Sequence, residues 1–240
     1  MQKEKKIHIE DIGCVHFIQN SRIKNINISI KPFKGVRVSF PMFVSFKNAE
    51  QVVYKKQEWI KTHSDKIKDI ESNKTIFNKN SVFKTRKHIL EINQHNDNKI
   101  SVNVNDTKIF VNYPIDINIK NENVQKAIRR GIEKAWELEA YDILPERLEY
   151  LAKKTGLFYK DIVIKNLKSR WGSCSHDNII SLSVHLMNLP DHLIDYVLLH
   201  ELVHTVEKSH NKNFWISLQK VTDNAKELKK QMKHHKIGIY

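Results

Sequence analysis

The strongest constraint on this chain is an apolar segment that carries two histidines and a glutamate at helical spacing. From Asp195 to Val206 it reads Asp-Tyr-Val-Leu-Leu-His-Glu-Leu-Val-His-Thr-Val. Side chains four residues apart lie on one face of a helix, so His200 and His204 are placed to bind the same divalent ion. Glu201 lies one residue round the helix, close enough to a water on that ion to take its proton. The motif therefore indicates metal-dependent hydrolytic chemistry.

The residues around the motif favour a buried helix over a solvated one with chance histidines. Apolar side chains recur at helical spacing on the faces beside the two histidines. They are Leu193, Ile194, Val197, Leu198, Leu202 and Val206. Burying three polar side chains without partners costs several kcal/mol, which favours a bound ion.

A catalytic zinc site takes three protein ligands and leaves a position for water. His210 follows His204 after a gap of five residues, which is long enough for the chain to leave the helix and turn back. We therefore expect His200, His204 and His210 to hold one zinc ion per chain. Glu207 is a rival, either as a ligand or as an acceptor for an imidazole N–H.

Several segments with these residues resemble the YgjP-like family, the zinc metallopeptidase-like proteins of the DUF45 group. They are Arg170-Trp171-Gly172-Ser173-Cys174-Ser175, the Ile-Ile-Ser-Leu strand after it, Pro190 to Tyr196, His200-Glu201-Leu202-Val203-His204, His210 and Phe214-Trp215. Upstream, Gly35-Val36-Arg37-Val38, Pro41, Lys56 and Trp59 extend the resemblance over most of the chain. SprT-like and WLM-type proteases are more distantly similar. The resemblance implies a zincin core.

The chain carries a large excess of positive charge. Lysine and arginine number 41 against 27 aspartates and glutamates, which gives a net charge of +14. Such an excess favours polyanionic partners, among them nucleic acid and nucleotides. The alternative is a lysine-rich composition that serves solubility, because the charge is spread along the chain without one dense basic tract.

Cysteine usage and hydropathy bear on location. Cys14 and Cys174 lie far apart and form no Cys-x-x-Cys pair, which is typical of a reduced, intracellular protein. The sequence has no apolar N-terminal run and no apolar stretch of membrane-spanning length. We therefore expect a cytoplasmic protein without a membrane partner.

The patterning predicts an α+β fold. Period-two apolar runs from Lys6 to about Ser45 predict a small antiparallel sheet, and a helix follows over about 48–72. Strands return between 75 and 119, with hairpin turns expected at 96–98 and 105–106. We predict a β-rich N-terminal region over 1–119 and a zincin-like catalytic domain over 120–240.

Within the catalytic domain, Asn121 or Asn123 is expected to cap a long helix that Pro145 kinks or divides and Gly156 ends. Three strands, at 162–167, 170–174 and 179–184, then precede the metal-binding helix. A final helix over about 213–233 is expected to cover the site. Asn178 to Val184 is the expected sheet edge for binding an extended peptide.

These residues predict a zinc hydrolase that acts on a protein or peptide, with Glu201 as the general base. Tyr196, Arg170 and His185 are candidates for a second electrophile or a substrate contact, and Arg170 equally suits a structural ion pair. Two alternative functions also involve a bound metal ion. One is a nucleotide phosphohydrolase of the nucleoside triphosphate pyrophosphatase type, and the other is a nucleic-acid-associated module with a structural ion.

Overall fold

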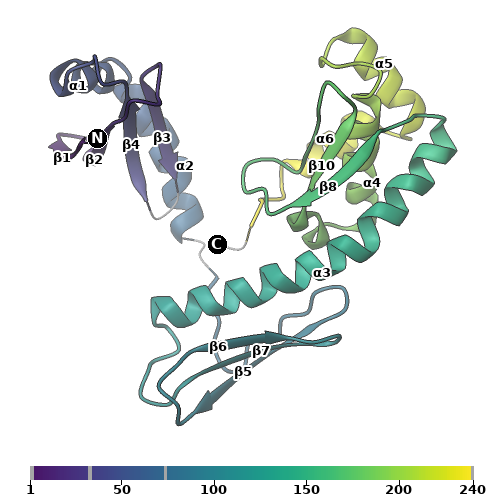
Figure 1. Cartoon of the computed structure of the whole chain (residues 1–240), viewed down its shortest axis with the longest axis horizontal. Coiled ribbons are helices and arrows are strands. Elements are labelled where there is room, and N and C mark those ends of the chain that lie inside the picture. The colour runs from purple at the N-terminus through teal and green to yellow at the C-terminus, as the bar shows by residue number, and fades with distance from the viewer. Residues whose placement is uncertain (1–2, 32–33, 73–74, 239–240) are drawn as a thin grey trace. The chain divides into compact units, whose positions relative to one another are not determined.

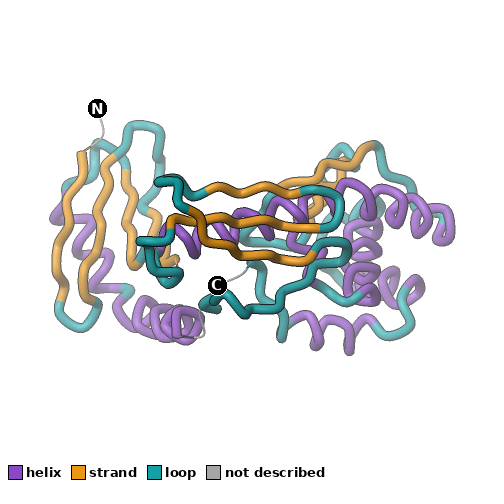
Figure 2. The backbone as a smooth tube through the Cα atoms, turned by 90° about the horizontal axis from the view of Figure 1, so that it is seen from below, coloured by secondary structure: helices purple, strands orange, loops and turns teal. Residues whose placement is uncertain are grey.

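The computed structural model describes residues 3–31, 34–72 and 75–238. Figure 1 shows the elements along the chain, and Figure 2 distinguishes its helices from its strands. The chain divides into two compact units, one from Met1 to Thr75 and one from Ile76 to Ile239. Both contain strands and helices, so the predicted α+β class is confirmed. Among the helices of the described residues, none is both long and apolar enough to cross a membrane.

The N-terminal unit is a four-stranded sheet with two helices. Its sheet has the order β1-β2-β4-β3, and β2 pairs with β4 in parallel, so the prediction of an antiparallel sheet is wrong for this central pair. Alternating hydrophobicity identifies strands but does not specify which ones pair. The predicted single helix is two helices, interrupted at Lys56. The elements are β1 (Lys3–Ile9), β2 (Gly13–Gln19), β3 (Asn27–Lys31), β4 (Gly35–Phe40), α1 (Phe46–Lys55) and α2 (Gln57–Ser72).

One long helix, α3 (Glu122–Thr155), runs through the C-terminal unit. Asn121 caps it by accepting a hydrogen bond from the backbone N–H of Asn123, and Gly156 ends it with a φ of 69°. Both predicted ends are thus confirmed. Pro145 lies inside the helix without dividing it, and Figure 1 shows the helix bent along its length.

A three-stranded sheet packs on the first half of α3. The sheet has the order β5-β7-β6, with β5 (Ile89–His95), β6 (Ser101–Val104) and β7 (Lys108–Pro114). A Cβ added at Gly131 of α3 would lie 2.7 Å from Cγ2 of Ile109, so the glycine permits this close packing. The strands therefore share a core with α3, and the units divide after Thr75 rather than at the predicted 119/120 boundary.

One of the two expected hairpins is present in this sheet. The turn at 105–106 does join a hairpin, because β6 pairs antiparallel with β7. The expected hairpin at 96–98 is wrong, because β5 pairs in parallel with β7 and not with β6. Turn-forming residues indicate where a chain reverses, but they do not determine the partner of the strand that follows.

The second half of α3 packs against the elements that carry the metal motif. A second three-stranded sheet has the order β8-β10-β9, with β8 (Asp161–Lys165), β9 (Gly172–Cys174) and β10 (Ile179–Ser183). Since β10 pairs with both neighbours, the expectation that Asn178 to Val184 forms the sheet edge is wrong. Its buried side chains, Ile180 and Leu182, suit a central strand, and β8 and β9 are the two edge strands.

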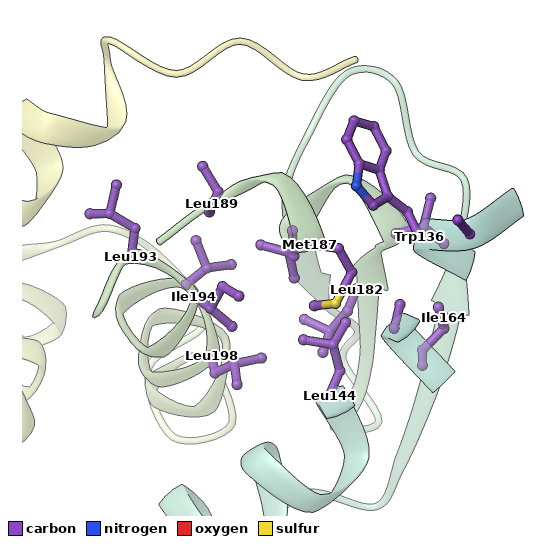
Figure 3. Close-up of a cluster of buried hydrophobic side chains, with 14 of the residues drawn as sticks. Trp136, Leu144, Ile164, Leu182, Met187, Leu189, Leu193, Ile194 and Leu198 are labelled. Atoms are coloured by element: carbon purple, nitrogen blue, oxygen red, sulfur yellow. The ribbon is translucent and has the colours of Figure 1, made fainter. Parts of the chain in front are cut away.

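The motif lies on α4 (Asp191–Val203), which follows the short helix η1 (Val184–Asn188). The predicted final helix is two helices, α5 (Lys212–Val221) and α6 (Ala225–Met232), because the side chain of Asn224 caps a new helix. Five of the six residues of the predicted apolar face are buried in a core shared with α3, β10 and η1, whereas Val206 lies beyond the end of α4 and is 61% exposed. Figure 3 labels Trp136, Leu144, Ile164, Leu182, Met187, Leu189, Leu193, Ile194 and Leu198 in this core.

Side chains from two other segments fasten the N-terminal half of α4. Arg86 donates to the backbone oxygen of Leu189 at 2.7 Å and pairs with Asp191 at 2.5 Å. Arg147 of α3 forms a two-pronged pair with Asp195, at 2.6 and 2.5 Å. Such planar pairs fix orientation as well as distance.

The turn that carries Arg86 is held by a buried carboxylate. Glu139 of α3 is 1% exposed, and it accepts from the backbone N–H of Lys87 at 2.8 Å and of Arg86 at 3.3 Å. The same carboxylate contacts Nδ1 of His88 at 2.8 Å and the hydroxyl of Thr85. One side chain thus satisfies several buried donors and orders the turn.

We predict that Glu139→Ala destabilises the protein by about 3 to 5 kcal/mol, since it leaves buried donors without an acceptor. Glu146→Ala, at an exposed position of the same helix, is the matched control and should change stability by less than about 0.5 kcal/mol. Urea unfolding of the three proteins measures the difference. Equal losses in both variants would show that the buried network contributes nothing.

Candidate metal centre

Three imidazole rings converge at the end of α4. Nε2 of His210 lies 2.9 Å from Nε2 of His200 and 3.2 Å from Nε2 of His204. The candidate ligand atoms of the three residues all lie within 4.8 Å of one another. The structure thus brings together the three histidines that the sequence predicts as ligands, and their donor atoms suit a transition metal such as zinc.

A backbone carbonyl orients one of these rings. Nδ1 of His204 lies 2.9 Å from the backbone oxygen of Glu207. Because a carbonyl only accepts, Nδ1 carries the hydrogen and Nε2 presents a lone pair toward the other rings. Glu207 contributes through its main chain, and its carboxylate faces Asn211 at 3.5 Å, so the rival prediction of Glu207 as a ligand is not supported by its position.

An aromatic side chain forms the floor of the cluster. Phe214, which is fully buried, has its ring centroid 4.8 Å from that of His200, 4.5 Å from His204 and 4.7 Å from His210. Trp215 flanks the outer side, 6.0 Å from the ring of His210. These contacts restrict the imidazoles to orientations that share one centre.

The surroundings of the cluster keep two of its imidazoles neutral. Burial, together with the smaller effects of the neighbouring His204, His210 and Lys229, lowers the pKa of His200 to about 3. Burial also lowers the pKa of His204, against the opposing hydrogen bond to Glu207. A metal ion binds the neutral imidazole, so these two residues need not lose a proton near pH 7.

Glu201 lies beside the histidines with an unsatisfied oxygen. Its side chain is 6% exposed, and its Oε2 is buried without a hydrogen-bond partner among the described residues. Burial raises the pKa of Glu201 to about 7, and the positive charge of Arg170 opposes that rise. A buried carboxyl oxygen without a partner indicates a ligand at this position.

The side chain of Glu201 packs closely against Gly172 of the edge strand β9. A Cβ added at Gly172 would lie 2.8 Å from Cγ and 2.9 Å from Oε1 of Glu201. Glycine is therefore the residue that lets the carboxylate occupy this place. In the sequence Gly172 stands out only as part of the Arg170–Ser175 motif, because spacing along the chain does not show which side chain crosses it.

The candidates for a second electrophile separate into two groups. Arg170 and Tyr196 line the same pocket as His200 and Glu201. His185 is fully buried elsewhere, with Nε2 3.0 Å from Oδ1 of Asn166 and its ring against Trp136. His185 therefore has a structural position away from the three histidines.

The loop that returns His210 to the cluster depends on Asn211. Its Oδ1 accepts from the backbone N–H of Phe214 at 2.9 Å and caps α5. Its Nδ2 donates to the hydroxyl of Ser209 at 3.2 Å and to Glu207 at 3.5 Å. Asn211 thus ties the loop after α4 to the first turn of α5, while Glu207 occupies the position that glycine takes in the H-E-x-x-H-x-x-G-x-x-H motif.

A profile of the YgjP-like metallopeptidase domain matches residues 24–235, and the chain belongs to this family. Membership in a metallopeptidase family implies a divalent metal ion. A search of curated proteins finds no match.

Two solved structures are similar to part of the chain. The metallopeptidase zymogen of Pyrococcus abyssi abylysin is 26% identical, and the match covers 38% of this chain and 93% of that chain with a TM-score of 0.35. The metallopeptidase zymogen of Methanocaldococcus jannaschii jannalysin is 22% identical, with the same coverage and a TM-score of 0.34.

We predict that Asn211→Ala lowers the free energy of unfolding by about 1 kcal/mol, the usual cost of a lost N-cap. Asn213→Ala, at an exposed position inside the same helix, serves as the control and should leave stability unchanged or slightly raised. Thermal and urea unfolding measure both. A variant at 211 as stable as the control would rule out the proposed role of the cap.

Proposed function

We propose that this chain is a zinc-dependent peptidase in which His200, His204 and His210 hold one ion and Glu201 is the general base. The single observation that supports this most is the convergence of three imidazole nitrogens beside a buried carboxyl oxygen that has no partner among the described residues. A structural zinc site has four protein ligands. Among the described residues, the cluster comprises three, which favours a catalytic site.

The residues present fit a zinc ion. Three imidazole nitrogen donors suit zinc, and the carbonyl of Glu207 fixes the donor atom of His204. When bound, the ion supplies Lewis acidity, which polarises both water and a peptide carbonyl. All other steps depend on side chains of this chain.

Glu201 takes the proton of the attacking water and passes it to the leaving amine. A pKa near 7 suits both steps, because a general acid–base group works best when its pKa is close to the working pH. Gly172 leaves room for the carboxylate at this place, because a Cβ there would lie 2.9 Å from Oε1 of Glu201. Arg170 and Tyr196 line the pocket where the oxyanion would develop, and either could donate a hydrogen bond there.

The edge of β9 offers a place for an extended substrate. The oxygen of Trp171 accepts from Ser183 and the N–H of Ser175 donates to Ile179, so the main chain of these residues faces β10. In an antiparallel ladder the alternate residues, Gly172 and Cys174, direct their groups outward. In the described chain no strand pairs with that side, and a peptide added there would pass Glu201.

We predict that Glu201→Gln retains zinc but loses about 100-fold or more in turnover of a denatured protein, because the amide cannot accept a proton. His210→Ala should lose zinc and turnover together. His176→Ala, with a side chain 97% exposed, is the control and should keep both. Metal analysis and a proteolysis assay give the readouts.

Three outcomes would oppose the proposal. Full turnover by the Glu201→Gln protein would contradict the assignment of Glu201 as the base. Full zinc content in the His210→Ala protein would contradict the assignment of His210 as the third ligand. Wild-type protein that hydrolyses nucleoside triphosphates and leaves proteins intact would favour the phosphohydrolase alternative instead.

We predict that Gly172→Ala keeps the zinc and lowers kcat by about 100-fold, because the new methyl displaces the Glu201 carboxylate by a fraction of an ångström or more. Ser173→Ala is the matched control, since the next side chain along a strand points to the opposite face. Steady-state kinetics and metal analysis of both proteins provide the measurement. An unchanged kcat for Gly172→Ala would show that the carboxylate tolerates this contact.

A further inference from the structure

A pocket of about 530 Å³ is lined by two of the three histidines, His200 and His210. The rest of its lining comes from Arg170 to Gly172 at the start of β9, from the face of α4 that carries Glu201, from Trp215 of α5, and from the end of α6. This volume accommodates one or two amino-acid side chains. The pocket therefore adjoins the place where a peptide bond would be cut.

The walls of the pocket are largely apolar. Five of its lining residues present aromatic or aliphatic surface: Trp171, Tyr196, Val197, Trp215 and Met232. Such surface gains free energy by removing an apolar side chain from water. A substrate that fills this pocket therefore carries an aliphatic or aromatic group.

The charges in the pocket are mostly positive. Arg170, Lys229 and Lys233 line it, and Glu201 is the single acidic residue among the described residues of its lining. Elsewhere the unit pairs many of its cations, as Arg147 pairs with Asp195. In the described chain, by contrast, neither Lys229 nor Lys233 has a carboxylate partner, so their ammonium groups are available to a substrate.

The position of Lys229 is held by an aromatic ring. Its Nζ lies 4.1 Å from the ring centroid of Trp215, and that ring also borders His200 and His210. A cation–π contact places the charge without neutralising it. The ammonium group is thus presented at the same mouth of the pocket as the three histidines.

We infer that this pocket binds a substrate carboxylate next to an apolar side chain, with Lys229 and Lys233 binding the carboxylate and Trp215 and Met232 the apolar group. The inference rests on the proposed peptidase function and names the substrate class. The carboxylate has two possible sources, the C-terminus of a peptide or the side chain of an acidic residue. A C-terminal source would make the enzyme a carboxypeptidase, and a side-chain source an endopeptidase selective for acidic residues.

Binding to the zinc-loaded Glu201→Gln protein tests the inference without turnover. The probes are acetyl-Ala-Ala-Phe-Leu with a free carboxylate, its C-terminal amide, and acetyl-Ala-Ala-Phe-Leu-Glu-amide, each titrated by calorimetry. We expect at least one carboxylate peptide to bind about tenfold more tightly than the neutral amide, as for one hydrogen bond to a charged group. The peptide that shows the preference identifies the source of the carboxylate.

Variants in the same background assign the preference to residues. Lys229→Met keeps the length and the packing on Trp215 but removes the charge, and it should reduce the tenfold preference to about twofold. Combining it with Lys233→Met should abolish the preference. Lys226→Met is the matched control, because Lys226 is exposed on the same helix and does not line the pocket. It should keep the full preference.

Two results would overturn the inference. One is equal binding of the neutral and carboxylate peptides, and the other is a carboxylate preference that survives loss of both lysines, which would place the anion on the metal or on Arg170. Absence of peptide hydrolysis by the wild-type protein would instead contradict the proposed function and leave the measured carboxylate preference standing. The two proposals therefore fail separately.

Discussion

The three imidazole nitrogens converge on one point, and the structure of the C-terminal unit depends on this constraint. Such convergence requires that α4 neither slide nor rotate, since a shift of about 1 Å would part the donor atoms. The helix is held at its start by Arg86 and Arg147 and along its length by a closely packed core. At its end Phe214 contacts all three rings. Packing far from the site thus provides the order that coordination demands.

The same burial that orders the site sets its protonation. Removal from water disfavours charge, so it lowers the pKa of His200 and raises that of Glu201. Both shifts serve one chemistry, since neutral imidazoles bind metal and a carboxyl with a pKa near 7 moves protons in both directions. One physical cause therefore prepares both the proposed ligands and the proposed base.

Local rules predicted the parts of the structure that local interactions determine. The ends of α3 at Asn121 and Gly156 follow from capping, and the meeting of His200 with His204 follows from helix geometry. The parallel pairing of β2 with β4 and of β5 with β7, and the central place of β10, depend on tertiary packing, and the predictions for them were wrong. Sequence patterns show which face of a strand is apolar but leave its neighbours undetermined.

The residues that the sequence did not reveal as functional share a property: each acts through a contact with a distant segment. Gly172 matters because Glu201 crosses it, and Lys229 because Trp215 lies beneath it. Neither a glycine nor a lysine in a lysine-rich chain stands out by type. The metal ligands stand out because coordination chemistry limits them to a few residue types, whereas substrate recognition can be built from common ones. The motif therefore indicates only the reaction class, whereas the substrate specificity of such a family has to be inferred from the structure of the pocket.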